Sequence, residues 1–370
     1  MIWLLIVAAG IGLLWLTVVF VHGLICYAHW RWQKRRRRLQ NMPLPLRVIH
    51  RYDFNDQRFM VRLAALDNAA LPKFNPGQFL TICIALENSS LISKRRYSIS
   101  NWQRHPRFYE LCIKRLADGK VSSRLFDALQ TGTEVSILPP DGVAFPVLKN
   151  QSEVVLMAGG VGISPVRSIV HFLSQQSRNT KISLFYSAAK RHDLCYLQEF
   201  TELSRELENF FFYPTLTQRE SDWPGLTGRL SVTSIMDSVS DTERATFILC
   251  GPDTMQQSLI TALQKKGISP SQIHFERFGA GKTTNADQAF NIQLESGKQF
   301  QFDTQPTLLS AMEDNNINIT SSCRTGECGD CRIQLLEGKV TQLNPAMVKL
   351  SDNEILPCCC VPASHLKIAL

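Results

Sequence analysis

The first thirty residues of this 370-residue chain contain no Lys, Arg, Asp or Glu, and the eight that follow contain no acid. Residues 31–38 alone carry six positive charges, while the whole chain has a net charge of +8. Because the excess is concentrated in one short block, a surface for nucleic acid is not indicated. Gly and Pro are too scarce for a collagen-like chain, and a hydrophobic fraction of 44% excludes a wholly disordered one.

The uncharged segment at residues 1–30 is long enough to cross a bilayer, since a membrane-spanning helix needs about 20 apolar residues. The basic block at 31–38 follows it directly, so the positive-inside rule places residues 39–370 in the cytoplasm and the N-terminus outside. A cleaved signal peptide would instead carry positive charge before a shorter apolar stretch. We therefore expect a transmembrane helix that anchors the chain once in the inner or plasma membrane, followed by a basic linker at 31–45.

The rest of the chain divides into three regions by its pattern of apolar residues. Short alternating runs separated by turn signals predict a small antiparallel β-barrel over residues 46–150. Over 151–280, buried-strand patterns alternate with helical ones, which predicts a parallel sheet in an α/β domain. After a polar linker at 281–289, residues 290–370 open with a hairpin and a helix and contain six of the eleven cysteines.

The cysteines of the last region have the spacing of an iron–sulfur site. Cys323, Cys328 and Cys331 form C-x4-C-x2-C, and the run at 358–360 offers a fourth thiolate. Four thiolates at such spacing hold a plant-type [2Fe–2S] cluster. In a reducing cytoplasm, clustered cysteines indicate metal or redox chemistry rather than disulfides. A structural zinc site is the alternative, although its ligands usually come as two C-x2-C pairs.

Residues 290–370, with CRTGECGDC as cluster loop, resemble a plant-type ferredoxin domain, and the resemblance implies an α+β β-grasp fold. The stretch LSDNEILPCCC is shorter than the family's usual sequence before the last ligand. Matching Ile355 and Leu356 to the family's apolar pair selects Cys358 as the fourth ligand and leaves Cys360 as the alternative.

Two stretches of the first region resemble flavin-binding elements of the ferredoxin–NADP reductase family. Arg95, Tyr97 and Ser98 match its RxYS motif. By that resemblance the arginine pairs with a flavin phosphate, the tyrosine offers an aromatic face, and the serine places a hydroxyl near the reactive ring nitrogen. The second stretch matches the family's turn into a helix that binds pyrophosphate, and it includes Lys114, Gly119, Val121 and Ser122. A diphosphate contact favours FAD, and FMN stays open.

The second region carries two motifs that resemble the nicotinamide half of the same family. After a predicted strand, its GGxGxxP motif would let a dinucleotide pyrophosphate approach the backbone. The matching residues are Gly159, Gly160, Gly162 and Pro165. Cys250, Gly251 and Pro252 match the family's CGP, in which the cysteine lies by the nicotinamide.

Ser187 and Arg191 follow the second strand of this region and could hold the 2′-phosphate of NADPH. A solvated loop explains these two residues equally well. The sequence therefore leaves NADH and NADPH open.

The order of the regions resembles the fused reductases that serve phenylacetyl-CoA epoxidase, the hybrid-cluster protein and membrane acyl-CoA desaturases. The resemblance covers residues 46–370 and implies an NAD(P)H oxidoreductase that passes a hydride to FAD and then single electrons to the cluster. Cys250 and Ser98 would shape the stacked pair, and Glu276 would close over the flavin edge as a third catalytic residue.

The anchor makes a membrane-bound di-iron oxygenase, a fatty-acid desaturase in particular, the expected electron acceptor. The last region has 6 basic and 9 acidic side chains over 288–370, so its net charge of −3 suits a basic partner. The alternatives are a membrane-bound redox sensor or interaction module, and a component of a respiratory NADH:quinone-type complex.

Overall fold

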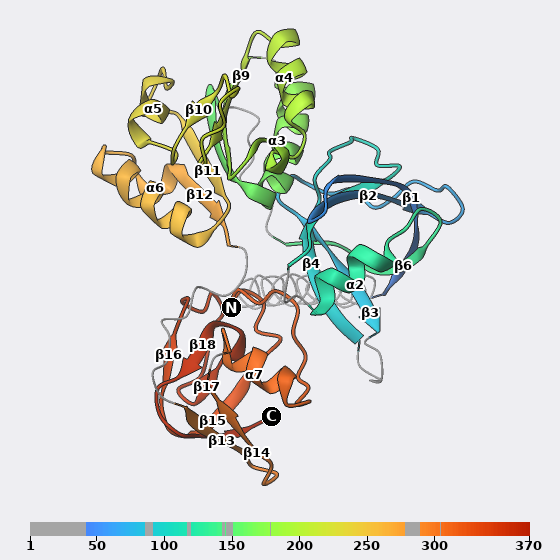
Figure 1. The fold of residues 1–370 in the computed structure, drawn as a ribbon, viewed down its shortest axis with the longest axis vertical. Coiled ribbons are helices and arrows are strands. Elements are labelled where there is room, and N and C mark those ends of the chain that lie inside the picture. The colour runs from blue at the N-terminus through green and yellow to red at the C-terminus, as the bar shows by residue number, and fades with distance from the viewer. Residues whose placement is uncertain are drawn as a thin grey trace, which may run out of the picture. The chain divides into compact units, whose positions relative to one another are not determined.

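The computed structural model has one compact unit over Pro45–Leu370, which holds three folded regions (Figure 1). The residues that it describes are 42–85, 92–116, 120–142, 145, 151–177, 179–277, 289–303 and 305–370. The expected anchor at 1–30, most of its basic linker and most of the linker at 281–289 lie outside these residues. Within them, no helix is both long enough and apolar enough to cross a membrane.

The first region is a six-stranded sheet in the order β4-β3-β6-β1-β2-β5. Its elements are β1 (Leu44–Asn55), β2 (Arg58–Ala65), β3 (Phe79–Ala85), β4 (Ile92–Ser98), β5 (Tyr109–Lys114), α2 (Lys120–Ala128) and β6 (Glu134–Asp141). Antiparallel pairs join β1 to β2, β2 to β5, and β3 to both β4 and β6. A bridge between Ile99, just beyond β4, and Leu111 in β5 connects the two edges of the sheet. The strands therefore close into the barrel that the alternating pattern predicts.

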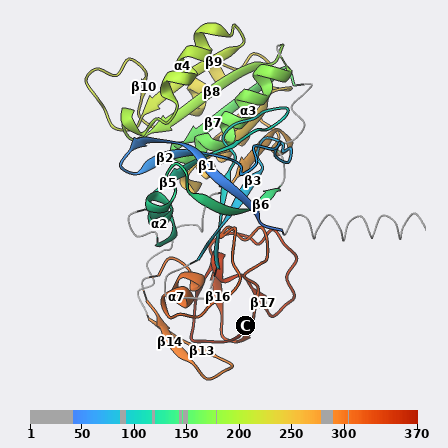
Figure 2. The same ribbon diagram turned by 90° about the vertical axis from the view of Figure 1, so that its right-hand side faces the viewer.

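The second region is a six-stranded sheet in the order β10-β9-β8-β7-β11-β12, with parallel pairing throughout. Its strands are β7 (Glu153–Gly159), β8 (Lys181–Ala188), β9 (Phe210–Leu216), β10 (Leu226–Thr227), β11 (Thr246–Cys250) and β12 (Ile273–Glu276). Its helices are α3 (Ile163–Gln176), α4 (Leu197–Glu206), α5 (Val232–Asp237) and α6 (Asp253–Lys265). Every residue of β7 and β11 is buried, because helices cover both faces of the sheet. Figure 2 shows α3 and α4 beside the central strands.

The order of these parallel strands fixes where a ligand can bind. From β7 the chain proceeds through β8 and β9 towards one edge, and then returns to place β11 on the other side of β7. In open parallel sheets, ligands bind beyond the carboxyl ends of the two strands at such a switch point, here β7 and β11. The predicted GGVG and CGP motifs follow these two strands.

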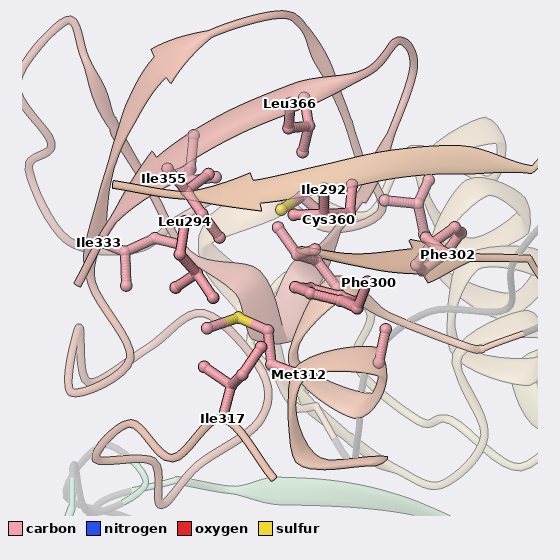
Figure 3. Close-up of a cluster of buried hydrophobic side chains, with 14 residues drawn as sticks. Ile292, Leu294, Phe300, Phe302, Met312, Ile317, Ile333, Ile355, Cys360 and Leu366 are labelled. Atoms are coloured by element: carbon pink, nitrogen blue, oxygen red, sulfur yellow. The ribbon is translucent and has the colours of Figure 1, made fainter. Parts of the chain in front are cut away.

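The third region is a five-stranded sheet in the order β14-β13-β19-β15-β17, with a separate pair formed by β16 and β18. Its elements are β13 (Phe290–Leu294), β14 (Gln299–Phe302), α7 (Leu308–Asp314), β15 (Ile333–Glu337), β16 (Val340–Gln342), β17 (Glu354–Ile355), β18 (Cys360–Pro362) and β19 (Leu366–Ala369). Alternate residues of β13 and β14 bury Ile292 and Phe300 against Met312 of α7 (Figure 3). This core and its mixed sheet have the α+β character expected of the cysteine-rich region.

Candidate functional site

The loop after β7 is built for close approach to its backbone. Gly160 has φ of +55°, a conformation that L side chains rarely adopt, and among the described residues no atom lies within 4 Å of its missing Cβ. A Cβ on Gly162 would instead lie 2.2 Å from the carbonyl oxygen of Cys250. Gly160 therefore leaves open space above the backbone, and Gly162 lets this loop pack on the end of β11.

The remaining residues of the two nucleotide motifs lie around the same switch point. Gly159 ends β7, Pro165 is buried in the first turn of α3, and Gly251 and Pro252 connect β11 to α6. Because Gly162 precedes α3 and has no side chain, no side chain caps the first amides of that 14-residue helix. A helix N-terminus of this kind suits a phosphate group.

Three predicted catalytic residues meet at the end of the second sheet. Ser98, the last residue of β4, donates from Oγ to Oε1 of Glu276 at 2.9 Å. Glu276 ends β12 and is paired in register with Cys250 at the end of β11. The side-chain amide of Gln256 donates to the carbonyl oxygens of Gly251 and Glu276, at 2.7 Å each, and holds the two strand ends together.

Burial sets the protonation of this group. It raises the pKa of the Glu276 carboxyl to about 8, against the smaller opposite effect of the hydrogen bond from Ser98. The second carboxyl oxygen, Oε2, is buried and has no hydrogen-bond partner within the described residues. Burial also raises the pKa of the Cys250 thiol, and the neighbouring Glu276 adds to this effect. At neutral pH the site thus contains a neutral thiol and a carboxyl that holds a proton.

The flavin-motif residues lie on β4, β5 and α2. Burial lowers the pKa of Arg95 to about 10 and raises that of the Tyr97 hydroxyl to about 12. The Arg95 guanidinium donates to Ser93 Oγ at 3.0 Å and to the Lys94 carbonyl oxygen at 2.8 Å. Arg95 and Tyr97 are two residues apart on β4, so strand alternation places their side chains on the same side of the sheet.

The predicted pyrophosphate turn is only partly described. Lys114 ends β5, and Val121 is buried in α2, which begins one residue after Gly119. Gly119 itself lies outside the described residues. The hydroxyl of Ser122 accepts a hydrogen bond from the Leu116 amide at 3.0 Å and so closes the turn into α2.

Ser187 and Arg191 lie where the sequence places them, at and just beyond the end of β8. Ser187 is buried, whereas Arg191 is exposed. The backbone amide of Arg191 donates to Oε1 of Glu220 at 3.1 Å. Sequence reasoning missed this carboxylate, because the two residues are 29 positions apart and carry no joint motif.

The four predicted cluster ligands converge in the third region. Cys328 Sγ lies 3.1 Å from Cys323 Sγ, and the thiol of Cys358 forms hydrogen bonds with those of Cys323 and Cys331. The pKa of Cys323 is lowered, because the thiol of Cys328 donates a hydrogen bond to its sulfur. Cys360, by contrast, is packed in the hydrophobic core of the third region (Figure 3).

The loop that carries three of these cysteines turns its amides towards their sulfurs. The Thr325 amide donates to Cys323 Sγ and the Asp330 amide to Cys328 Sγ, each at 3.4 Å. Gly326 and Gly329 have φ of +83° and +75°, which permits the tight turns that bring these amides inward. In the described part of the chain, no three His, Cys, Asp or Glu side chains are arranged to hold a single metal ion.

Three family models match the chain in the order of its three regions. An oxidoreductase FAD-binding domain matches residues 45–145, an oxidoreductase NAD-binding domain 156–260, and a 2Fe-2S iron-sulfur cluster binding domain 292–363. The chain is an NAD(P)H-dependent oxidoreductase with an FAD-binding domain, an NAD-binding domain and a carboxy-terminal [2Fe–2S] domain. We refer to its three regions as the flavin, nucleotide and ferredoxin domains.

Relatives of this reductase match it over most of its length. The glycine betaine monooxygenase reductase subunit of Chromohalobacter salexigens is 27% identical over 329 residues, which cover 82% of this chain and 89% of that protein. The phthalate 4,5-dioxygenase oxygenase reductase subunit of Pseudomonas putida is 27% identical over 298 residues, or 80% of this chain and 86% of that protein. The structure of phthalate dioxygenase reductase shares the fold, with a TM-score of 0.66 at 24% identity over 90% of this chain and 99% of that one.

The cofactors of this reductase are FAD and a [2Fe–2S] cluster, and NAD(P)H is its electron source. The geometry fits each group. Open space above Gly160, and a start of α3 that no side chain caps, suit a dinucleotide. The buried Oε2 of Glu276 has no hydrogen-bond partner among the described residues, which suits a contact with bound FAD. Four converging thiols and inward-facing loop amides suit a cluster.

Proposed function

We propose that this reductase takes electrons from NAD(P)H and delivers them, through FAD and its [2Fe–2S] cluster, to a membrane-bound oxygenase. Relatives that match most of the chain are reductase components of oxygenase systems, which supports an oxygenase as acceptor. The observation that carries the first step is the hydrogen bond between Ser98 and Glu276, because it joins the RxYS strand to the end of the nucleotide sheet.

The proposed roles of the residues follow from their positions. FAD, when bound, accepts a hydride from NAD(P)H and releases single electrons to the cluster. Ser98, Cys250 and Glu276 would line the place where the flavin and nicotinamide rings meet, and at neutral pH none of the three side chains carries a charge. Arg95 and Tyr97 of β4 hold the flavin phosphate and ring face, with Lys114, Gly119, Val121 and Ser122 at the turn into α2.

Glu276 would hold a proton beside the flavin edge. Its pKa of about 8 keeps the carboxyl protonated at neutral pH, and the hydroxyl of Ser98 lies 2.9 Å away to relay a proton. A protonated carboxyl can donate from the buried oxygen that is otherwise without a partner. A proton donor at this position would offset negative charge that develops beside it.

On the nucleotide, Gly159, Gly160 and Gly162 would receive the pyrophosphate, while Pro165, Gly251 and Pro252 shape the two loops. We propose that the nucleotide is NADPH, with Ser187 and Arg191 at its 2′-phosphate. Cys323, Cys328, Cys331 and Cys358 would be the cluster ligands, since Cys360 is enclosed in an apolar core.

The membrane part of the proposal depends on the uncharged segment at 1–30 and the basic block at 31–38. A single-pass anchor in the inner membrane, with the domains in the cytoplasm, would hold the reductase in the plane of its acceptor. Tethering of this kind raises the effective concentration of the two proteins. A membrane fatty-acid desaturase or another di-iron enzyme is the proposed acceptor, and the net negative ferredoxin domain would dock on its basic surface.

The acceptor can be tested in native membranes. A photo-crosslinking residue placed at exposed Met347, which lies beside the cluster loop, should capture the electron acceptor. We expect crosslinks to a membrane-bound di-iron enzyme, and fewer of them at high salt. Crosslinks only to respiratory-complex subunits would contradict the proposal, and so would an unchanged yield when the residue is moved to the distant hairpin tip at Gly297.

A further inference from the structure

One face of α3 packs on the flavin domain, although the helix begins directly after the glycine loop of the nucleotide domain. Within the first ten residues of the helix, the side chains that make this contact are Ser164, Arg167, Ser168 and Phe172. Ser168 Oγ donates to the Asn101 carbonyl oxygen at 3.0 Å, and the Phe172 ring packs edge-on against Trp102 at 5.0 Å between centroids. Spacings of three and four residues place all four side chains on one side of the helix.

Arg167 forms the central contact of this face. Its Nη1 donates to Glu110 Oε1 at 2.5 Å and to the Ser100 carbonyl oxygen at 3.1 Å, both in the flavin domain. Its Nε lies 2.9 Å from both carboxylate oxygens of Glu199 in the nucleotide domain. The guanidinium also lies over the Tyr196 ring, 4.2 Å from its centroid. The side chain is 7% exposed, so nearly all of this charge is removed from water.

The groups around Arg167 balance its charge. Glu110, with only 1% of its side chain exposed, accepts a second ion pair from Arg62 at 2.8 Å. Glu199 is also bonded to His171 at 2.7 Å. Arg167 and Glu110 are the buried pair of this network, whereas Arg62 and Glu199 are partly exposed. The buried pair resists displacement, because moving one member leaves the other charge without a partner in a poorly solvating interior.

The position of this network relative to the reaction site suggests its role. Ser100, which accepts from Arg167, lies two residues beyond Ser98, and Arg167 lies five residues beyond Gly162. The Arg167 guanidinium thus connects the end of β4, which carries the Ser98 hydroxyl, to α3, which follows the glycine loop. Hydride transfer is sensitive to displacements of about 1 Å between the reacting groups.

We propose that Arg167 is a positioning residue for hydride transfer: it sets the separation and relative orientation of the flavin and nucleotide sites. The inference depends on the binding roles proposed above for Ser98 and Gly162. A second ion pair across the same boundary, between Arg58 and Asp193, keeps the domains associated when Arg167 is changed. Substitution should therefore alter the geometry of the site rather than separate the domains.

The test compares three variants. Arg167→Met removes the charge and the forked donors but keeps an unbranched apolar side chain, whereas Arg167→Lys keeps the charge and loses the forked donors. Arg104→Ala is the control, because Arg104 bonds Gln176 at 3.0 Å at the exposed far end of the same helix. Flavin and iron content, affinity for NAD(P)H, and anaerobic flavin reduction by stopped flow are measured for each protein.

In Arg167→Met we expect flavin reduction at saturating NAD(P)H to slow about 100-fold, together with a weaker charge-transfer band between reduced nicotinamide and flavin. Flavin content, the NAD(P)H dissociation constant and the rate of cluster reduction by the flavin should stay within about threefold. Arg167→Lys should recover part of the rate, and Arg104→Ala should match the wild type. A folded, flavin-loaded Arg167→Met protein with the wild-type rate of flavin reduction would overturn the proposal.

One further measurement tests the proposal without the loaded enzyme's activity, and one further variant covers a failure of the single variant to fold. In the cofactor-free protein, amide hydrogen exchange in residues 99–102 and 163–172 should accelerate in Arg167→Met and stay unchanged in Arg104→Ala.

If the single variant fails to fold, the double variant Arg167→Met with Glu110→Gln is used instead. It removes one positive and one negative charge together, so the remaining charges of Arg62 and Glu199 still balance. Wild-type exchange, or wild-type flavin reduction in the double variant, would contradict a positioning role. Failure of the proposed Ser98 and Gly162 roles would instead appear as normal hydride transfer when those residues themselves are changed.

Discussion

The hydride site and the cluster site of this reductase are assembled in opposite ways. Ser98 and Glu276, which share a hydrogen bond of 2.9 Å, are 178 residues apart and come from different domains. Three of the four proposed cluster ligands lie within nine consecutive residues, and the loop's own amides supply their hydrogen bonds. The first site depends on how two domains dock, and the second on the turns of one loop together with Cys358 from the same domain.

The difference predicts how each site should respond to change. A site held by one loop should fail completely when a ligand is lost, and it should leave the other site intact. A site held by two docked domains should lose rate by degrees as single contacts are removed. The following variants test this contrast, from the largest expected effect to the smallest.

Cys323→Ser should abolish the cluster, since this sulfur forms hydrogen bonds with both Cys328 and Cys358. We expect loss of cluster absorbance and of electron delivery to the acceptor, with flavin reduction by NAD(P)H kept within about twofold. Iron analysis and stopped-flow absorbance measure the two effects. Cys360→Ala is the matched control and should keep its cluster, because Cys360 lies in the apolar core. Loss of flavin reduction in Cys323→Ser would show that the two sites are not independent.

Ser98→Ala should slow flavin reduction about 100-fold, because the variant loses the hydroxyl that bonds Glu276. The effect should appear in the rate at saturating NAD(P)H, while cluster content stays normal. Single-turnover stopped flow under anaerobic conditions is the measurement. Ser136→Ala, which removes a partly buried hydroxyl from β6 of the same domain, is the control. Equal rates in the two variants would contradict a role for the Ser98–Glu276 contact.

Arg191→Ala should raise the KM for NADPH about tenfold and leave the KM for NADH unchanged, because only NADPH carries the 2′-phosphate. The main chain at this position is held by Glu220, so the variant should keep its loop conformation. Steady-state kinetics with both nucleotides, using Arg219→Ala as control, measure the change. A parallel loss for NADH would assign Arg191 a role unrelated to the 2′-phosphate.

The smallest effect is on stability. Burial raises the pKa of Glu276 to about 8, so the folded protein retains a proton that the unfolded chain releases near its ordinary pKa of 4.5. The stabilisation is complete below about pH 4.5 and is lost as the pH rises to about 8. In flavin-free Glu276→Gln, the loss of Tm between pH 5 and 8 should be smaller than in the wild type by a few degrees.

Calorimetry of the cofactor-free proteins at several pH values tests this prediction. Glu295→Gln, at an exposed position in the ferredoxin domain, should follow the wild-type curve. Parallel curves for Glu276→Gln and the wild type would mean that the carboxyl has no raised pKa in the folded protein.

The contrast between a site on one loop and a site between two domains also explains which features could be predicted from the sequence. The barrel, the parallel sheet and the cluster loop follow from local patterns: alternating residues, buried runs and the C-x4-C-x2-C spacing. The GGVG and CGP motifs were correctly placed after β7 and β11, because such motifs depend on a strand followed by a tight turn. A prediction of Glu276 as a catalytic residue depended on family resemblance, since nothing near it in the chain indicates its partner.

By itself, the sequence determined the order of the three domains, the cofactor motifs and the uncharged segment that precedes the basic block, because each of these is a property of consecutive residues. Only the tertiary structure decided that Cys358 approaches the other cluster cysteines while Cys360 packs in the core. It also paired Arg167 with Glu110, 57 residues away, through the docking of two domains. Contacts of this kind depend on which surfaces are buried together, and the spacing of residues along the chain does not determine this.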